Sequence, residues 1–329
     1  MFTFDLKWVR VSKRRYNMMK KFKVSVVIPA YNEAENISPL LERLLPVLQP
    51  YNDYEIIFVD DGSSDNTLNV LEFWHKKNEK VHYVSFSRNF GHQYALRAGI
   101  DYATGDCVIS MDADLQHPPE LLTEMIESWQ QGFDVVYTVR QDTEGAGWLK
   151  KVTSALFYKV FSFFSGLKLP QGTADFRLLD RKAANVLAAM QEGNLFLRGM
   201  VFWMGFKQKA VPYKAEKRFK GTSSYTLSKM VALAILGATS FSIKPLRVAI
   251  YLGLLIALFG GLFTAYVLYQ KLFGGSVITG WASLMSVVLV LGGVQLFMMG
   301  IIGEYIGMIF METKRRPKYI VQKTTVSKQ

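Results

Sequence analysis

Two long apolar runs near the C-terminus dominate the hydropathy pattern of the chain. Neither the run from Val248 to Tyr269 nor the run from Trp281 to Ile302 contains a charged residue, and Gln295 is the strong polar group of the second. A helix of about 20 residues crosses the hydrocarbon core of a bilayer, whereas helices buried in globular domains rarely stay uncharged over such a length. The pattern therefore predicts a two-helix transmembrane hairpin rather than two core helices.

Basic residues flank the predicted hairpin on its outer sides. Lys244 and Arg247 precede the first run, the segment from Lys314 to Lys318 after the second is rich in cations, and the connector holds Lys271. The positive-inside rule then predicts that both termini face the cytoplasm, at the inner or plasma membrane. Glycines in both runs would let helices approach closely within the hairpin or between copies of the chain, so a homo-oligomer stays open. These glycines are Gly253, Gly260, Gly261, Gly292, Gly293, Gly300 and Gly303.

A different pattern occupies the segment from Lys23 to about Val139, where short β-rich runs alternate with longer helix-like stretches. This alternation predicts an α/β fold with a mostly parallel sheet and helices on both faces. Ser38 followed by Pro39 is typical of a helix start, with serine as the N-cap and proline at the first helical position. The predicted strands are Val24–Ile28, Glu55–Val59, Val81–Phe86, Asp106–Met111 and Asp134–Val139.

Polar segments come directly after the predicted strands. Ligands of open parallel sheets bind beyond the carboxyl ends of the strands, so these segments form the candidate site. The first of them is not a glycine-rich turn, and the sequence has no G-x-x-x-x-G-K-S loop, which excludes simple NAD and ATP folds. The segments are residues 29–33, 60–65, 87–91 and 112–116.

Asp112 and Asp114 are one residue apart just after a predicted strand. In extended backbone this spacing points both carboxylates to the same side. Neighbouring carboxylates repel unless a cation lies beside them, and oxygen ligands favour Mg²⁺ or Mn²⁺. The Asp-x-Asp pair therefore indicates a divalent cation that neutralises a diphosphate; the alternative is two acids in an ordinary surface turn.

The chain carries a strong net positive charge. The 329 residues carry 39 Lys and Arg against 27 Asp and Glu, a net charge of +12, although the mean hydropathy is +0.12. These values exclude a disordered or collagen-like chain, and a lone cysteine, Cys107, excludes an internal disulfide. The cations gather in the N-terminal tail and beside the apolar runs, which favours an anionic membrane surface over nucleic acid. The tail either contacts lipid through Trp8 and its cations or has no role.

Seven motifs in order resemble glycosyltransferase family 2, specifically its polyprenyl-phosphate branch, which is similar to dolichol-phosphate mannose synthases and bactoprenol glucosyltransferases. The resemblance covers roughly residues 23 to 322 and implies the GT-A nucleotide-diphospho-sugar transferase fold followed by the hairpin. The motifs are Val26–Glu33, Asp60–Asp65, Ser87–Gly91, Met111–Glu120, Gly172–Leu178, Arg218–Gly221 and Gly303–Gly307.

The resemblance and the hydropathy pattern together predict the division of the chain. We expect a basic tail (residues 1–22), a cytoplasmic GT-A catalytic domain (23–225), a juxtamembrane interface helix (226–245), the hairpin (246–310) and a basic cytoplasmic tail (311–329).

The implied reaction is the inverting transfer of a sugar from a UDP-sugar to undecaprenyl or another polyprenyl phosphate, on the cytoplasmic face of the membrane. It would need Mg²⁺ or Mn²⁺ and would supply a lipid-linked sugar for cell-envelope glycosylation. Glucose is the favoured sugar, and UDP-N-acetylglucosamine is the alternative donor.

The resemblance also implies roles for individual residues. Asp175 matches the proposed catalytic base, with Asp114 as a second catalytic residue, but a phosphate monoester is largely ionised at neutral pH. Asp175 therefore either accepts a proton or only orients the substrates. The expected nucleotide-sugar ligands are Pro29, Tyr31, Glu33, Asp61, Arg88, Asp112 and Ala113; the metal ligands are Asp112, Asp114 and Gln116; the acceptor-phosphate ligands are Arg218, Arg198, Arg177 and Lys220.

Two other functions compete with this interpretation. A processive polysaccharide synthase would carry a Gln-x-x-Arg-Trp motif, but no tryptophan of this sequence follows an arginine. An inactive membrane-anchored assembly module would keep the fold without the chemistry, and the intact acids at Asp61, Asp112, Asp114 and Asp175 argue against it.

Overall fold

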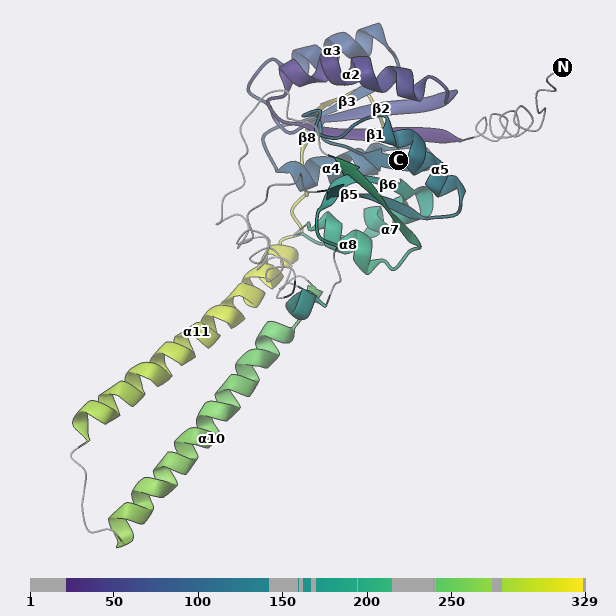
Figure 1. Cartoon of the computed structure of the whole chain (residues 1–329). Helices are drawn as coiled ribbons and strands as arrows, with labels where there is room; N and C mark the ends of the chain where they lie inside the picture. The colour runs from purple at the N-terminus through teal and green to yellow at the C-terminus, as the bar shows by residue number, and fades with distance from the viewer. Residues whose placement is uncertain are drawn as a thin grey trace, which may run out of the picture. The chain divides into compact units, whose positions relative to one another are not determined.

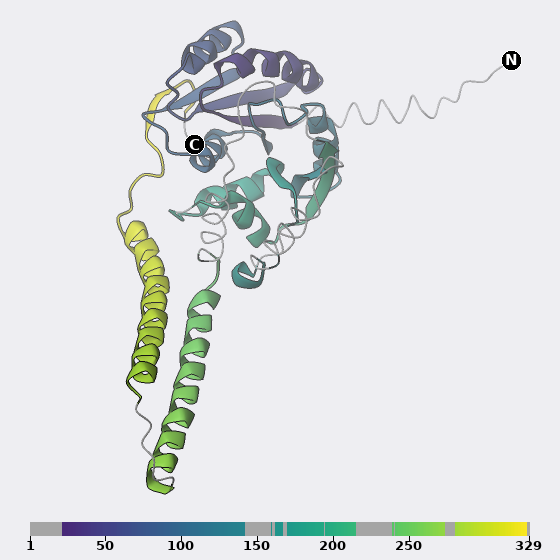
Figure 2. The same ribbon diagram turned by 60° about the vertical axis from the view of Figure 1, so that its left-hand side comes forward.

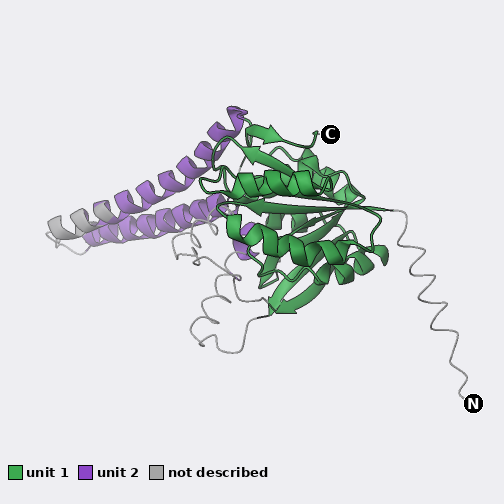
Figure 3. Ribbon diagram, turned by 90° about the horizontal axis from the view of Figure 1, so that it is seen from above, with its two compact units in different colours: residues 1–158, 168–225, 317–329 green, residues 159–167, 226–316 purple. Residues whose placement is uncertain are grey.

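The computed structural model describes residues 22–141, 159, 162–166, 170–193, 195–214, 239, 241–273 and 280–327. The chain forms two compact units (Figure 3). Unit 1 comprises Met1–Tyr158, Lys168–Tyr225 and Pro317–Gln329, and unit 2 comprises Lys159–Leu167 and Thr226–Arg316. The predicted N-terminal tail up to residue 21 and most of the predicted interface helix lie outside the described residues.

One mixed sheet forms the centre of unit 1, in the order β7-β5-β6-β4-β1-β2-β3-β8 (Figure 1). Its strands are β1 (Lys23–Ala30), β2 (Asp53–Asp60), β3 (Val81–Phe86), β4 (Cys107–Ser110), β5 (Val135–Gln141), β6 (Thr173–Asp180), β7 (Gln208–Lys214) and β8 (Val321–Thr324). Strands β4, β1, β2 and β3 are parallel, whereas β6 and β8 run antiparallel to their neighbours. The predicted strands and the mostly parallel sheet are confirmed.

Helices cover both faces of this sheet (Figure 2). On one face, α2 (Ala34–Leu48), α3 (Thr67–Lys77) and α5 (Leu121–Gln130) share a core with alternate residues of β1. On the other face, α4 (His92–Tyr102) packs so closely that a Cβ on Gly99 would lie 2.0 Å from Val27 Cγ1. The helices α7 (Arg181–Ala189) and α8 (Leu197–Trp203) extend this layer.

Helix α2 begins a turn earlier than Ser38 and Pro39 predict. Its N-cap is Glu33, whose carbonyl oxygen accepts from the N–H groups of Asn36 and Ile37 at 2.9 and 3.3 Å. The serine N-cap prediction is wrong because the chain after β2 supplies the cap: Asp65 Oδ2 accepts from Ala34 N–H at 3.3 Å. A distant side chain therefore replaces the local one.

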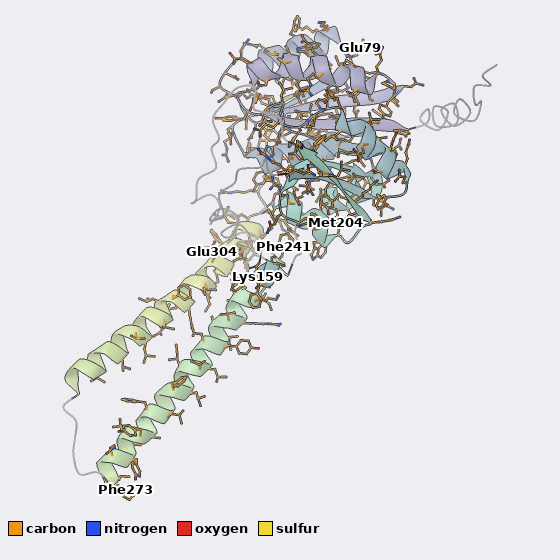
Figure 4. The ribbon with its side chains drawn as sticks, viewed as in Figure 1. Glu79, Lys159, Met204, Phe241, Phe273 and Glu304 are labelled. Atoms are coloured by element: carbon orange, nitrogen blue, oxygen red, sulfur yellow. The ribbon has the colours of Figure 1, made fainter. Side chains whose placement is uncertain are left out.

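Unit 2 contains two long apolar helices, α10 (Lys244–Phe273) and α11 (Trp281–Thr313). Both are long and apolar enough to cross a membrane, and their apolar windows are 0% buried. Many of their described apolar side chains, including Phe273 at the end of α10, are exposed (Figure 4). The helices are longer than the predicted spans, and they suggest membrane association of the chain.

The glycines of these helices do not form the close contact predicted from the sequence. A Cβ on Gly253 would meet Met298 at 3.8 Å, but a Cβ on Gly260, Gly292 or Gly300 would meet no atom of the described residues within 4 Å.

The C-terminal segment, predicted as a basic cytoplasmic tail, contains a strand that joins the sheet of unit 1. Residues 317–329 belong to unit 1, and β8 pairs antiparallel with β3, where Ser85 faces Lys323. The pairing satisfies backbone groups that the edge of β3 would otherwise leave open.

Candidate active site

A cavity of about 300 Å³ opens at the carboxyl ends of β1, β2, β3 and β4. This is the edge at which the sequence places its candidate site, because ligands of parallel sheets bind there. The lining residues are Pro29, Ala30, Tyr31, Glu33, Asp61, Asn89, Gly91, His92, Ala95, Asp112, Ala113 and Asp114.

Hydrogen bonds tie the loop after β1 to the loop after β2. Asn32, at φ 55°, accepts at its side-chain oxygen from Ser64 N–H at 2.9 Å, and its own N–H donates to Ser63 Oγ at 2.9 Å. Asparagine tolerates this left-handed backbone better than other non-glycine residues. The two loops therefore hold Tyr31 and Glu33 in fixed positions along the cavity.

Gly62 allows the loops after β2 and β3 to meet. Its φ is +67°, and a Cβ there would lie 2.3 Å from the backbone carbon of Arg88. Only glycine fits such a backbone contact without a shift.

Asp61 holds the loop after β3 through its carboxylate. The side chain is 2% exposed and accepts from Phe90 N–H at 2.7 Å and from Gly91 N–H at 2.9 Å. Burial raises the pKa of Asp61 more than these two hydrogen bonds lower it. A buried acceptor of this kind suits a donor group of a bound base, because a carboxylate has about four acceptor positions.

The two acids after β4 line the cavity from a strained turn. Leu115 is buried at φ 62°, and this backbone brings Gln116 N–H to Asp114 Oδ1 at 3.1 Å. On the other side, Asp112 N–H donates to Nδ1 of the buried His117 at 3.0 Å. A leucine in left-handed backbone costs about 1–2 kcal/mol, which the surrounding contacts must offset.

The carboxylates of Asp112 and Asp114 fit a divalent cation. Asp112 Oδ1 is buried and makes no hydrogen bond with the described residues, and its neighbour His92 Nε2 lies 3.4 Å away. Within the described part of the chain, no group of three or more His, Cys, Asp or Glu residues could hold a metal ion. The two carboxylates of Asp112 and Asp114 suit Mg²⁺ or Mn²⁺, which commonly bind one or two carboxylates and complete their coordination with substrate phosphates and water.

Beside the cavity, the buried Asp175 is surrounded by cationic side chains. It is 5% exposed, and it accepts from Arg177 Nη2 at 2.7 Å, from Arg198 Nε at 3.0 Å and Nη2 at 2.9 Å, and from Gln93 Nε2 at 3.3 Å. His92 Nε2, which belongs to the cavity, is 3.8 Å from Asp175 Oδ2. Asp175 thus connects the cavity to two arginines.

The charges of this cluster determine its protonation. Burial alone would raise the pKa of Asp175, but the guanidinium groups of Arg198 and Arg177 outweigh it and hold the pKa well below its usual range. Burial lowers the pKa of Arg177 to about 10, so this arginine stays protonated at neutral pH. Asp175 is therefore a firmly ionised carboxylate whose oxygens are already bound.

Most of the residues of this site lie in a segment that matches a known family profile. The glycosyl transferase family 2 profile matches residues 25–187, and a Bacillus subtilis glycosyltransferase, YkcC, is 46% identical over 93% of this chain and 95% of its own length. The chain belongs to glycosyl transferase family 2. The predicted family and GT-A fold are confirmed.

Further matches extend into the C-terminal helices. The GtrB C-terminal hairpin profile matches residues 244–309. The SfII prophage-derived bactoprenol glucosyl transferase of Shigella flexneri is 40% identical over 92% of this chain and 98% of its own length. The solved mannosyltransferase PcManGT from Pyrobaculum calidifontis, in complex with GDP-Man and Mn²⁺, is 16% identical with a TM-score of 0.48, over 72% of this chain and 71% of that one.

The family 2 site brings most of the predicted donor residues together. Arg88 and Gln116 are not among the described residues that line the cavity: the Arg88 guanidinium lies 4.3 Å from the Phe90 ring centre, and Gln116 is half-buried. Arg198 and Arg177 meet at Asp175, whereas Arg218 and Lys220 lie outside the described residues.

Sequence reasoning missed His92 and Gln93. Both lie in the first turn of α4, directly after the polar segment that follows β3. Extending the search for polar groups from that segment into the first turn of the next helix would have found them.

Proposed function

We propose that this chain transfers glucose from UDP-glucose to the phosphate of a bactoprenol-type polyprenol at a membrane surface. The observation that carries the proposal is the carboxylate-lined cavity in a family 2 chain that is 40% identical, over 92% of its length, to a named bactoprenol glucosyl transferase. UDP-N-acetylglucosamine is the alternative donor.

In this proposal the cavity binds the UDP-sugar. Tyr31, Glu33 and Asp61 surround the nucleotide, and the remaining acceptor position of the Asp61 carboxylate takes the N–H of the uracil ring. Asp112 and Asp114 hold Mg²⁺ or Mn²⁺, which when bound neutralises charge on the departing diphosphate.

The proposed reaction is a single displacement at the anomeric carbon. An oxygen of the acceptor phosphate forms the new bond to C1, the bond from C1 to the diphosphate oxygen breaks, and UDP leaves with that electron pair. The acceptor is already largely ionised near neutral pH, since its second pKa is about 6. A general base is therefore unnecessary.

We assign Asp175 a positioning role instead of proton transfer. Its oxygens are occupied by Arg177 and Arg198, so it fixes the direction of the Arg198 guanidinium, whose side chain is 32% exposed. Arg198 is then the described cation best placed to receive an anionic acceptor, while Arg177, 4% exposed, balances the buried charge. Arg218 and Lys220 stay proposed acceptor ligands on the basis of the family resemblance.

We propose that both ends of the helix pair lie at the cytoplasmic face of the membrane, and the connectivity of the units supports this orientation. The chain leaves unit 1 at Tyr225 before α10 and returns to it at Pro317 after α11, which supports the emergence of both helix ends on the same face of the membrane. Lys244, Arg247 and Arg315 flank those ends and favour the cytoplasmic face.

The test is a donor screen with the purified full-length protein and undecaprenyl phosphate. UDP-glucose, UDP-N-acetylglucosamine and GDP-mannose are supplied in parallel with Mn²⁺ or Mg²⁺, and the organic phase is assayed for lipid-linked sugar. We expect glucosyl lipid of inverted anomeric configuration, lost in Asp112→Asn. A preference for another donor would replace the sugar assignment, and hydrolysis without lipid product would refute transfer to the lipid.

A further inference from the structure

The residues after α11 contact the rest of unit 1 through Tyr319. Its ring stacks on Phe86, with centroids 5.0 Å apart and an interplanar angle of 15°. Its hydroxyl donates to Asp101 Oδ2 at 2.9 Å. We call residues 317–327, which include β8, the C-terminal strap. Figure 1 shows β8 at the edge of the sheet beside β3.

From Tyr319, contacts lead directly to the donor cavity. Phe86 is the last residue of β3, and its ring meets Phe90 edge-on at 5.6 Å. The Phe90 N–H is one of the donors to the cavity carboxylate of Asp61. In addition, the strap carbonyl of Ile320 accepts from Ser87 N–H at 3.0 Å. The strap therefore holds the loop after β3 by its side chain and by its backbone.

The strap also holds helix α4, which begins at the cavity residue His92. Asp101, which accepts from Tyr319, also accepts from Arg97 Nε at 2.8 Å. Arg97 and Lys318 both donate to the carbonyl oxygen of Met190, at 3.1 and 2.7 Å. One network thus joins the strap, α4 and the end of α7.

We propose that Tyr319 is a positioning residue for the nucleotide-sugar site. It fixes the loop after β3 and the α4 helix, so that Asn89, Gly91 and His92 line the cavity in their binding positions. The inference rests on the proposed donor role of this cavity. Tyr319 itself does not line the cavity. It stacks on Phe86 and donates to Asp101, and neither of these residues lines the cavity either. Its removal therefore acts on donor binding through the loop.

The experiment compares Tyr319→Ala and Tyr319→Phe with the wild type in the full-length purified protein. Phenylalanine keeps the stack on Phe86 and removes the hydrogen bond to Asp101. Lys323→Ala is the matched control, because Lys323 lies on the same strap but makes an exposed ion pair with Glu72 at 3.1 Å. We measure KM for UDP-glucose, KM for undecaprenyl phosphate, kcat, and hydrogen exchange of residues 87–91.

We expect Tyr319→Ala to raise the donor KM about tenfold, with the acceptor KM within twofold of wild type and faster exchange of the Phe90 and Gly91 amides. Tyr319→Phe raises the donor KM about threefold, and Lys323→Ala leaves all values unchanged. An unchanged donor KM in both Tyr319 variants overturns the proposal, as does an equal rise in both KM values. If Tyr319→Ala does not fold, Tyr319→Phe decides alone. A wild-type protein that transfers no sugar would instead refute the proposed function.

Discussion

Replacing Asp175 with asparagine separates a positioning role from a proton-transfer role. The two side chains have nearly the same shape, so the change removes the negative charge and one acceptor oxygen. Arg177, 4% exposed, is then a buried cation without its carboxylate, whereas Arg198, with 32% of its side chain exposed, can turn toward water. The cost therefore falls mainly on Arg177.

The magnitude follows from the burial of this pair. Removing one partner of a buried ion pair costs about 3–5 kcal/mol. In a domain of about 200 residues each kcal/mol lowers Tm by about 2–4 °C, so we expect a loss of roughly 10 °C. Turnover falls at least about tenfold because Arg198 loses its orientation, and the KM for UDP-glucose stays within about threefold.

The assays are thermal unfolding and steady-state kinetics, with Asp175→Asn/Arg177→Met as the second variant. Removing both charges of the pair should recover about 1–3 kcal/mol of the lost stability, because interacting sites are not additive. Turnover stays low in the double variant, since Arg198 still lacks the carboxylate of Asp175 that orients its guanidinium. A single variant that unfolds at the wild-type temperature yet has lost turnover would contradict the positioning role and favour a direct role in the chemistry.

Three further outcomes test other parts of the molecule. Gly62→Ala would place a Cβ 2.3 Å from the neighbouring loop and should weaken UDP binding, measured by calorimetry, more than tenfold. The control is Gly132→Ala, at φ +89° with no described atom within 4 Å, which should cost about 1 kcal/mol of stability and leave UDP binding unchanged. Chelator should abolish lipid product and Mn²⁺ or Mg²⁺ should restore it, but restoration should fail in Asp112→Asn; chelator-resistant activity would refute the metal site. Burial works against the ionised form of Glu55, but hydrogen bonds, first that from Lys23, outweigh burial and lower the pKa of Glu55. The stabilisation from ionised Glu55 is therefore full above the ordinary pKa of 4.5 and is lost as the pH falls through the lower pKa of the folded state. Glu55→Gln should cost about 2 kcal/mol at pH 7 and much less at pH 3 in denaturant titrations, and an equal loss at both pH values would contradict this.

Much of the fold could be predicted because its signals are local. The strand from Val81 to Phe86 begins and ends as its β-rich run predicts. The start of α2 could not be predicted in this way, because its cap comes from Asp65, on a loop after another strand. The strand β8 escaped notice for the same reason: Tyr83 N–H donates to Thr325 Oγ1 across a separation of 242 residues.

The candidate site, too, could be predicted from the sequence only in part. The acids after β4 and the segments after β1 and β2 could be placed at one edge from the parallel alternation alone. The partners of each acid could not: Asp175 binds Arg198, which comes from α8, and Asp112 Oδ1 is left without a hydrogen bond among the described residues. These partners decide whether an acid transfers a proton, positions a neighbour or holds a cation.

By itself, then, the sequence determined that the chain has a mostly parallel sheet, a pair of membrane-length helices and a row of acids at the carboxyl ends of the strands. These features follow from residue periodicity and from chemistry within a few positions of the chain. Only the tertiary structure decided that Asp175 binds two arginines and that Tyr319 reaches, through Phe86, the loop that lines the cavity. Both depend on contacts between segments distant in the sequence, and burial gives those contacts their energy because water no longer competes for the charges and hydrogen bonds.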